Sequence, residues 1–243
     1  MINYAVLTDK GCREVNEDSV SVYQKDDDFC FVLCDGLGGH GMGDEASQLV
    51  VKSFGNSFDE TDFDIKKFLP EAFEKAQNEL MSEQAIKRAS SKMKTTCVAA
   101  ITDGKKLAVG HVGDSRLYYF SKGKVLKRTL DHSIPQMLVL TKDIKESEIR
   151  HHPQRSLILR VMGTPWEKPM YDLEKIVSIR KCQAILLCSD GFWELVEEDE
   201  MCELLSSTDS PLAWLKELEK KVKEHGSGTD MDNYSAIAVW FSK

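Results

Sequence analysis

The sequence predicts an α+β fold whose β-sheets are mainly antiparallel. Strand-like runs recur along the whole chain, helical periodicity is confined to two blocks, and helices do not follow each strand in turn. A doubly wound α/β fold would instead alternate strands with helices. No repeat, flexible linker or change of composition divides the 243 residues, so we expect one domain, 1–243.

Six short runs have the length and composition of strands. Several are rich in Val, Ile, Phe and Tyr, or are bounded by Gly and Asp. The runs are residues 29–34, 95–102, 106–112, 117–121, 184–188 and 235–241. Gly123 follows one of them directly, which predicts a hairpin there.

The two helical blocks keep apolar residues three and four positions apart. The first has Asp44 as its expected cap and extends through residues 68–80. The second covers residues 198–205 and 212–222. Between two predicted sheet regions, residues 131–163 are the least regular part of the chain. This segment is either a functional lid or a solvated connection.

The composition excludes several classes of protein. The chain has 40 acidic and 32 basic residues, a net charge of −8, and 42% apolar residues. Such a balance argues against binding of nucleic acid or an anionic membrane through bulk charge, and no window approaches the roughly 18 apolar residues of a membrane span. The N-terminus lacks a signal-peptide pattern, and seven cysteines suit reduced thiols. We therefore expect a cytoplasmic, globular protein.

Four Asp residues lie at the ends of predicted strands. Asp35 precedes Gly36 directly after an apolar run, and Asp190 follows another such run. Asp232 precedes the last strand, and Asp114 lies between two strands. A single Asp-Gly is usually an ordinary turn, but four such carboxylates together indicate a metal site. Carboxylate and carbonyl oxygens suit Mg²⁺ or Mn²⁺ better than zinc.

A charged segment near the N-terminus offers further groups of this kind. Arg13 has the guanidinium that grips phosphate bidentately, and Glu17 or Asp18 could hold metal-bound water. An isolated charged segment is more often a plain exposed loop, so this interpretation depends on its partners. Templates for covalent hydrolysis are absent, including G-x-S-x-G and a Cys followed six residues later by Arg. The remaining hydrolytic mechanism is attack by a metal-activated water.

The glycines after the first Asp also admit a second interpretation. Residues 36–41 contain G-x-G-x-x-G after a strand and before a helix, as in a dinucleotide-binding fingerprint. The polar stretch 56–64 replaces the second strand with its terminal acid that such a fold requires. The pattern therefore favours the metal site over the dinucleotide site.

Taken together, these residues resemble the metal-dependent protein serine/threonine phosphatases of the protein phosphatase 2C type, particularly the short bacterial members. The motifs occur in the family's order and span nearly the whole chain. The matching stretches are Arg13-x-x-Asn16-Glu17-Asp18, Asp35-Gly36-Leu37-Gly38-Gly39-His40-x-x-Gly43-x-x-Ala46-Ser47, Thr95-Thr96, Gly113-Asp114-Ser115-Arg116, Asp131-His132-Ser133, Ser189-Asp190-Gly191 and Asp232-Asn233-Tyr234-Ser235.

The resemblance implies a central sandwich of two antiparallel sheets flanked by pairs of helices, with a site for two Mn²⁺ or Mg²⁺ ions at one edge. It implies that Asp35 bridges both ions, the Gly36 carbonyl binds one, and Asp190 and Asp232 hold the other. A hydroxide between the ions would attack phosphorus in line.

The resemblance also implies roles for residues around the two-metal site. Glu17 and Asp18 would act through metal-bound waters, and Asp114 would form a weaker third metal site with Asp190. Arg13 would bind the phosphoryl oxygens.

The general acid stays open between two alternatives. Leu37 stands where animal members of the family have a His. His40 or a metal-bound water would therefore protonate the leaving group.

The expected function is a protein phosphatase that acts on phosphoserine and phosphothreonine, with residues 131–163 as a flap over the cleft. The expected partners are phosphorylated proteins and a cognate Ser/Thr kinase, and the chain is expected to be a monomer. The alternative is a catalytically weak relative that binds phosphoproteins as a regulatory module.

Overall fold

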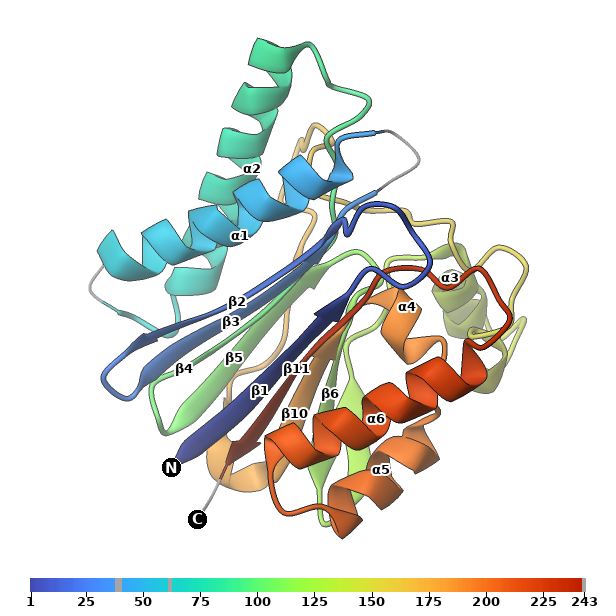
Figure 1. Cartoon of the computed structure of the whole chain (residues 1–243). Coiled ribbons are helices and arrows are strands. Elements are labelled where there is room, and N and C mark those ends of the chain that lie inside the picture. The colour runs from blue at the N-terminus through green and yellow to red at the C-terminus, as the bar shows by residue number, and fades with distance from the viewer. Residues whose placement is uncertain (38–40, 61–62, 242–243) are drawn as a thin grey trace.

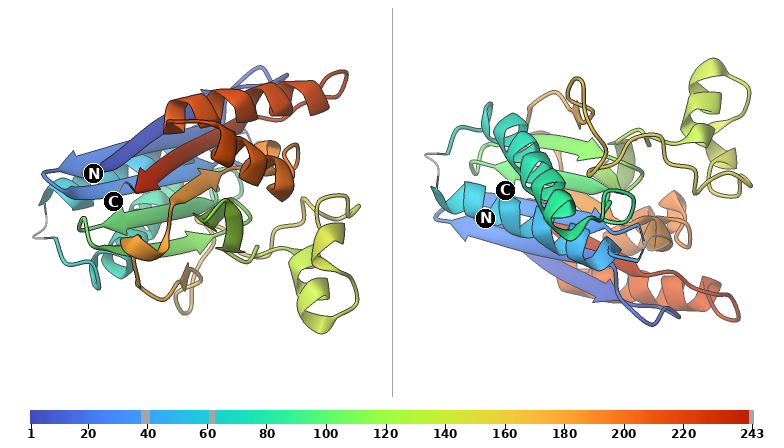
Figure 2. Two further views of the ribbon diagram at one scale, coloured as in Figure 1. Left: turned by 90° about the horizontal axis from the view of Figure 1, so that it is seen from below. Right: turned by 90° about the horizontal axis from the view of Figure 1, so that it is seen from above.

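The structure is a computed structural model that describes residues 1–37, 41–60 and 63–241. Within these ranges the strands form a five-stranded and a six-stranded sheet that pack face to face, with helices on both outer faces (Figure 1 and Figure 2). Every strand pairing is antiparallel. The predicted α+β sandwich is therefore confirmed, and the parallel βαβ unit of a dinucleotide-binding fold is absent from the described residues.

The first sheet joins the two ends of the chain. Its strand order is β1 (Ile2–Asp9), β11 (Tyr234–Phe241), β10 (Ala184–Cys188), β6 (Arg116–Ser121) and β7 (Lys124–Arg128). The second sheet has the order β2 (Asp18–Lys25), β3 (Asp28–Asp35), β4 (Cys97–Thr102), β5 (Lys106–Val112) and β8 (Asp172–Leu173), and β9 (Val177–Ser178) also pairs with β5.

The helices cover the two sheets in separate groups. The second sheet is covered by α1 (Gly43–Glu60) and α2 (Phe68–Lys87), and the first by α4 (Asp190–Trp193), α5 (Glu198–Ser207) and α6 (Pro211–His225). The remaining α-helix, α3 (Ile134–Thr141), stands away from these layers in both views of Figure 2. Short 3₁₀ turns lie at η2 (Glu146–Glu148) and η3 (Ile179–Lys181). In the described residues no helix has the length and apolarity to cross a membrane.

The core has three layers, one between the sheets and one under each group of helices. Strand β3 is buried on both faces, which explains why its sequence is an uninterrupted apolar run. Phe31 and Leu33 face the other sheet, whereas Cys30, Val32 and Cys34 face α1 and α2, and all five are fully buried. A strand buried on both faces loses the alternation of a surface strand.

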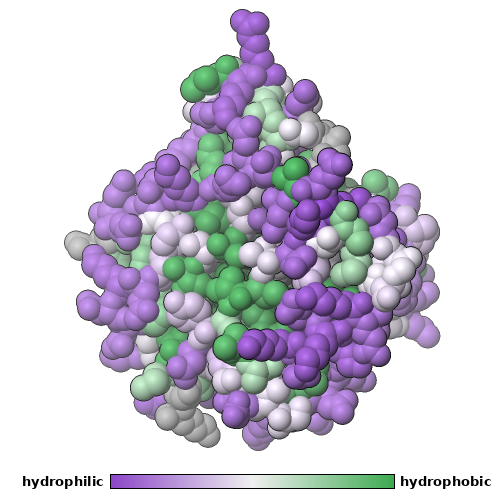
Figure 3. Space-filling model, viewed as in Figure 1, coloured by the Kyte–Doolittle hydropathy of each residue, from purple (hydrophilic) through white to green (hydrophobic). Residues whose placement is uncertain are grey.

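All six predicted strands are present, with bounds that shift by at most two residues, and β6 and β7 form the hairpin expected at Gly123. Strands β1 and β2 escaped prediction because they are edge strands with mixed, partly exposed sequences. Figure 3 shows apolar surface in the region of these edges, and Val6 of β1 is exposed. Helix α1 begins at Gly43, so Asp44 lies in its first turn and is not the cap.

A buried ion pair joins the start of β6 to the segment after β7 and packs against the helix that follows β10. Arg116 donates from Nε and Nη2 to the two carboxylate oxygens of Asp131, at 2.9 and 2.7 Å, and both side chains are at most 3% exposed. The Arg116 guanidinium also stacks on the Trp193 ring, 3.4 Å from its centroid. Trp193 Nε1 in turn donates to the backbone carbonyl of Asp114 at 3.0 Å.

We predict that Asp131→Ala lowers the free energy of unfolding by about 3–5 kcal/mol, because it removes the carboxylate that pairs bidentately with the buried Arg116 charge. Urea denaturation followed by circular dichroism measures this loss. The double variant Arg116→Met, Asp131→Leu removes both charges and should lose less. A single variant as stable as the wild type would contradict the prediction.

Candidate metal centre

The antiparallel topology brings acidic residues from both sheets to one end of the sandwich. Asp18 opens β2 and Asp35 closes β3, and the two residues lie directly opposite each other in the ladder. In an antiparallel pair the end of one strand lies beside the start of the next. Two carboxylates that are 17 residues apart in sequence are therefore neighbours.

The first sheet contributes its carboxylates in the same way. Asp190 follows β10 at the start of α4, and Asp232 precedes β11, the strand that pairs with β10. Asp114 lies in the turn that leads from β5 in one sheet to β6 in the other. The carboxyl groups of Asp35 and Asp190 are close enough to share a hydrogen bond. The structure thus brings together the four strand-end Asp residues and Asp18.

Crowding and burial make these carboxylates hard to ionise in the absence of a cation. Burial raises the pKa of Asp18 to about 7, and Asp190 and Asp232 add to this shift. Burial and neighbouring carboxylates also raise the pKa of Asp190 to about 6. The pKa values of Asp35 and Asp114 are raised well above their ordinary range by burial and by the charge of Asp190. A divalent cation would relieve this repulsion.

The donor set fits a hard divalent cation. Asp18 Oδ1 and Asp114 Oδ1 are buried oxygens without a hydrogen-bond partner, which in a folded protein calls for a ligand, a water or an ion. The other oxygen of Asp18 accepts a hydrogen bond from Ser189 Oγ at 2.8 Å, which fixes the orientation of the carboxylate. Oxygen donors of this kind suit Mn²⁺ or Mg²⁺.

Two glycines allow the loops of the cluster to pack together. A Cβ on Gly36 would lie 2.3 Å from the Gly43 carbonyl oxygen and 2.7 Å from that of Glu17. A Cβ on Gly191 would lie 2.1 Å from the carbonyl oxygen of Asn233. Both positions therefore require glycine, because any side chain would push the ligand-bearing loops apart.

The N-terminal segment lies against this cluster. Arg13 donates from Nε and Nη2 to the two oxygens of Asp232, at 3.0 and 3.2 Å, and from Nη1 to Asp230 at 3.0 Å. Hydrogen bonding to Asp232 raises the Arg13 pKa. Glu17 is partly buried near Asp44, and burial raises its pKa. Arg13 and Glu17 thus lie beside the site, while their roles toward phosphate and water remain predictions.

Three polar residues without a predicted role hold the cluster in place. Ser189 Oγ also accepts from the backbone N–H of Ser235 at 2.9 Å. Asn233 accepts from the N–H of Glu17 at 2.8 Å and donates to the carbonyl oxygens of two residues of the 10–15 loop. Thr96 exchanges two hydrogen bonds with the Asp35 backbone, at 2.8 and 3.0 Å. Ser189 and Asn233 are sequence neighbours of predicted ligands, a pattern that could have identified them.

Two predictions concern segments outside this cluster. His40, the candidate general acid, lies outside the described residues. Residues 131–163, the candidate flap, contain α3 and η2 and project from the layered body (Figure 2). Their role as a flap remains a prediction.

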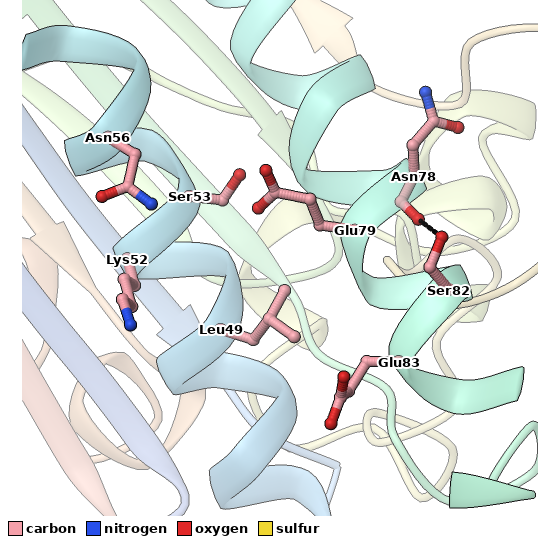
Figure 4. A pocket seen from close by; sticks show the side chains of 8 residues that line it. All are labelled: Leu49, Lys52, Ser53, Asn56, Asn78, Glu79, Ser82 and Glu83. Carbon is pink, nitrogen blue, oxygen red and sulfur yellow. Dashed lines mark hydrogen bonds between the residues drawn. The ribbon is translucent and has the colours of Figure 1, made fainter. Parts of the chain in front are cut away.

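A separate groove of about 520 Å³ lies between α1 and α2 (Figure 4). Its lining residues are Leu49, Lys52, Ser53, Asn56, Asn78, Glu79, Ser82 and Glu83. Lys52 is the one cation among these eight residues, and two glutamates offset its charge. The groove is therefore poorly suited to a phosphate group.

The sandwich and its cluster of oxygen donors define the class of a metal-dependent hydrolase. The profile of the family described as protein phosphatase 2C matches residues 12–225. A serine/threonine phosphatase, stp, of Listeria monocytogenes is 31% identical over 207 residues, which cover 82% of this chain and 81% of that protein. The chain belongs to the protein phosphatase 2C family.

Solved structures agree with this assignment. The serine/threonine phosphatase Stp1 from Staphylococcus aureus superposes with a TM-score of 0.91 and 29% identity, covering 100% of this chain and 96% of that one. The catalytic domain of the phosphatase PstP, solved in complex with two manganese ions, gives a TM-score of 0.82 and 26% identity, with 98% and 97% coverage.

We predict that Asp190→Asn raises the melting temperature of the metal-free protein at pH 7.5. The pKa of Asp190 in the folded state, about 6, exceeds its ordinary value of 3.8. The folded state therefore binds more protons than the unfolded state between about pH 4 and 6, so the contribution of this group to stability falls as the pH rises through that window. Relief of about 1 kcal/mol corresponds to about 2–4 °C.

Thermal melts in chelator at pH 5 and pH 7.5 measure this effect. The variant should also show a smaller fall in melting temperature between the two pH values than the wild type. Asp209→Asn, at an exposed site, is the control and should melt like the wild type. A variant that is no more stable than the wild type at pH 7.5 would contradict the predicted repulsion.

Proposed function

We propose that this chain is a serine/threonine protein phosphatase that hydrolyses phosphoserine and phosphothreonine in other proteins. The observation that carries the proposal is the convergence of five carboxylates, two of them with unpartnered buried oxygens, at one edge of a protein phosphatase 2C sandwich. Similarity to phosphatases of Listeria monocytogenes and Staphylococcus aureus supports the same activity. In this proposal residues 1–243 form one catalytic domain.

The residues in place would hold two Mn²⁺ or Mg²⁺ ions. Asp35 would bridge them, the Gly36 carbonyl would complete one side, and Asp190 and Asp232 would hold the other. When bound, the two cations supply a hydroxide at neutral pH for in-line attack on phosphorus. Asp114 would contribute with Asp190 to a weaker third site.

The remaining residues would act around the ions. Glu17 and Asp18 would orient water at the site, and Ser189 fixes the Asp18 carboxylate for this role. Arg13 would bind the phosphoryl oxygens and offset the charge that develops during the attack. His40, in the glycine loop, is our candidate for the group that protonates the departing alkoxide.

The irregular segment and the partners complete the proposal. Residues 131–163 would cover the cleft as a flap and influence which phosphoprotein enters. The substrates would be phosphorylated proteins, and a Ser/Thr kinase would be the opposing enzyme. The catalytic unit would be a monomer.

We predict that Asp35→Asn lowers hydrolysis of an aryl phosphate and of a phosphothreonine peptide by more than about 100-fold. Loss of a residue that merely orients a metal ligand already costs about 10–100-fold, so loss of the bridging charge should cost more. Turnover is measured with Mn²⁺, with Mg²⁺ and with chelator. Asp209→Asn should match the wild type. Metal-independent turnover, or full activity of a folded Asp35→Asn protein, would overturn the proposal.

We predict that Arg13→Ala raises KM for the phosphopeptide by about 10-fold, with a smaller change in kcat. A hydrogen bond to a charged group contributes about 1.5–3 kcal/mol. Steady-state kinetics separates the two constants. Arg13→Lys keeps the charge but loses the planar fork, so its KM should lie between the other two. An unchanged KM in Arg13→Ala would remove Arg13 from phosphate binding.

A further inference from the structure

The turn that bears Asp114 begins at Gly113, whose backbone N–H and carbonyl both form hydrogen bonds with His132. The His132 backbone N–H donates to the Gly113 carbonyl at 2.9 Å, and the Gly113 N–H donates to His132 Nδ1 at 3.2 Å. Gly113 has φ +105°, a conformation that favours glycine, and a Cβ there would lie 2.6 Å from Thr96 Cβ. Without a side chain, Gly113 depends on these two hydrogen bonds for its position.

The hydrogen bond from Gly113 fixes the tautomer of the His132 ring. Because an N–H group donates to Nδ1, that nitrogen carries a lone pair, and the proton of the neutral ring is on Nε2. His132 Nε2 lies 3.1 Å from Asp172 Oδ2, and a carboxylate only accepts. Arg160 Nη1 is farther from Nε2, at 3.5 Å, and donates to the other oxygen of Asp172 at 3.2 Å. The position of Asp172 is fixed by strand β8, which pairs with β5 so that Asp172 lies opposite His111. Asp172 thus selects the tautomer that Gly113 requires.

The same residues do not form a second metal site. His111, His132 and Asp172 bring one ligand atom each within 4.8 Å of the others. However, the two imidazole rings are stacked, with centroids 4.7 Å apart and planes 16° apart, so their in-plane lone pairs do not converge on one ion. His132 also uses Nδ1 toward Gly113, so metal binding through Nε2 would demand a ring without any proton. The His132 pKa is lowered to about 4, mainly by burial, which agrees with a neutral ring.

Two further contacts anchor this turn. The Asp114 carbonyl accepts from Trp193, and Ser115 Oγ shares a hydrogen bond with Thr96 Oγ1 at 2.8 Å. These contacts hold the turn against α4 and against Thr96, which directly precedes β4. The two Gly113 hydrogen bonds add a further anchor, at His132, directly beside Asp114, whose carboxylate is 2% exposed and has an unpartnered oxygen.

We propose that Asp172 and His132 are positioning residues for Asp114: Asp172 holds His132 in its Nε2–H tautomer, and His132 then holds the Gly113 peptide so that Asp114 faces the other carboxylates. The proposal rests on the proposed function, because it takes Asp114 to be part of the metal centre. Neither residue touches the substrate or an ion; each acts through the backbone of the turn.

Two amide substitutions of His132 separate the roles of its ring nitrogens. His132→Asn places an acceptor oxygen near the former Nδ1 and can still receive the Gly113 N–H, whereas His132→Gln places its amide near the former Nε2. We expect His132→Gln to raise the Mn²⁺ concentration for half-maximal activity by about 10-fold, as for other residues that orient metal ligands, with KM unchanged. His132→Asn should stay within about 3-fold of the wild type.

A second set of experiments measures Mn²⁺ binding and the tautomer of His132 without an activity assay. Calorimetric Mn²⁺ titration should show weaker binding in His132→Gln than in His132→Asn. Nitrogen-15 NMR of the wild type should show His132 protonated at Nε2. In Asp172→Asn, whose amide can donate as well as accept, a fraction of His132 protonated at Nδ1 should appear, with an intermediate loss of Mn²⁺ affinity. Melting temperatures show whether each variant is folded, and Asp209→Asn is the control.

The outcomes separate the two hypotheses. A wild type without metal-dependent hydrolysis would refute the phosphatase, while NMR and calorimetry would still report on the turn. Equal effects of His132→Asn and His132→Gln on Mn²⁺ binding, or a wild-type ring protonated at Nδ1, would overturn the positioning role even if the enzyme is active. A selective loss in His132→Gln together with the tautomer change in Asp172→Asn would support it.

Discussion

Repulsion among carboxylates is the constraint on which this structure depends. Asp18, Asp35, Asp114 and Asp190 meet at one edge of the sandwich with raised pKa values, so their ionised forms disfavour the folded chain. A sequence selected for stability alone would not gather them. The rest of the fold must hold the groups together until cations neutralise them, and the same strain would supply part of the affinity for those cations.

The support comes from elements that do not themselves carry the charge. Each acidic residue lies at the end of a strand, or within two residues of one, and these strands are buried in the three-layer core, so moving a carboxylate would disturb a whole ladder. Beneath the cluster, Arg116 and Asp131 form a buried pair that stacks on Trp193 and reaches the Asp114 backbone. The charges at the site are thus held by rigid strands and by a neutral, hydrogen-bonded layer.

The sequence was sufficient to predict the sandwich and its acidic edge, but not the contacts that orient the edge. Runs such as 29–34 and 184–188 were predictable because burial on both faces makes them continuously apolar. Asp35 and Asp190 were found because each follows such a run. Edge strand β2 has no such pattern, and the link from Asp172 to Gly113 joins residues 59 positions apart through a histidine tautomer. Side-chain hydrogen bonds of that kind leave no periodicity in a sequence.

In the proposed function, Arg13 would link the acidic site to phosphate binding. Its Nε and Nη2 now donate to the two oxygens of Asp232, and these donors form the edge of the guanidinium that would grip a phosphoryl group bidentately. The same pair of N–H groups cannot serve both partners at once. A cation that competes for the Asp232 oxygens would free this edge, whereas Nη1 could remain with Asp230 as an anchor. If Arg13 binds phosphate as proposed, binding of metal by Asp232 and binding of phosphate by Arg13 would be coupled through this one carboxylate.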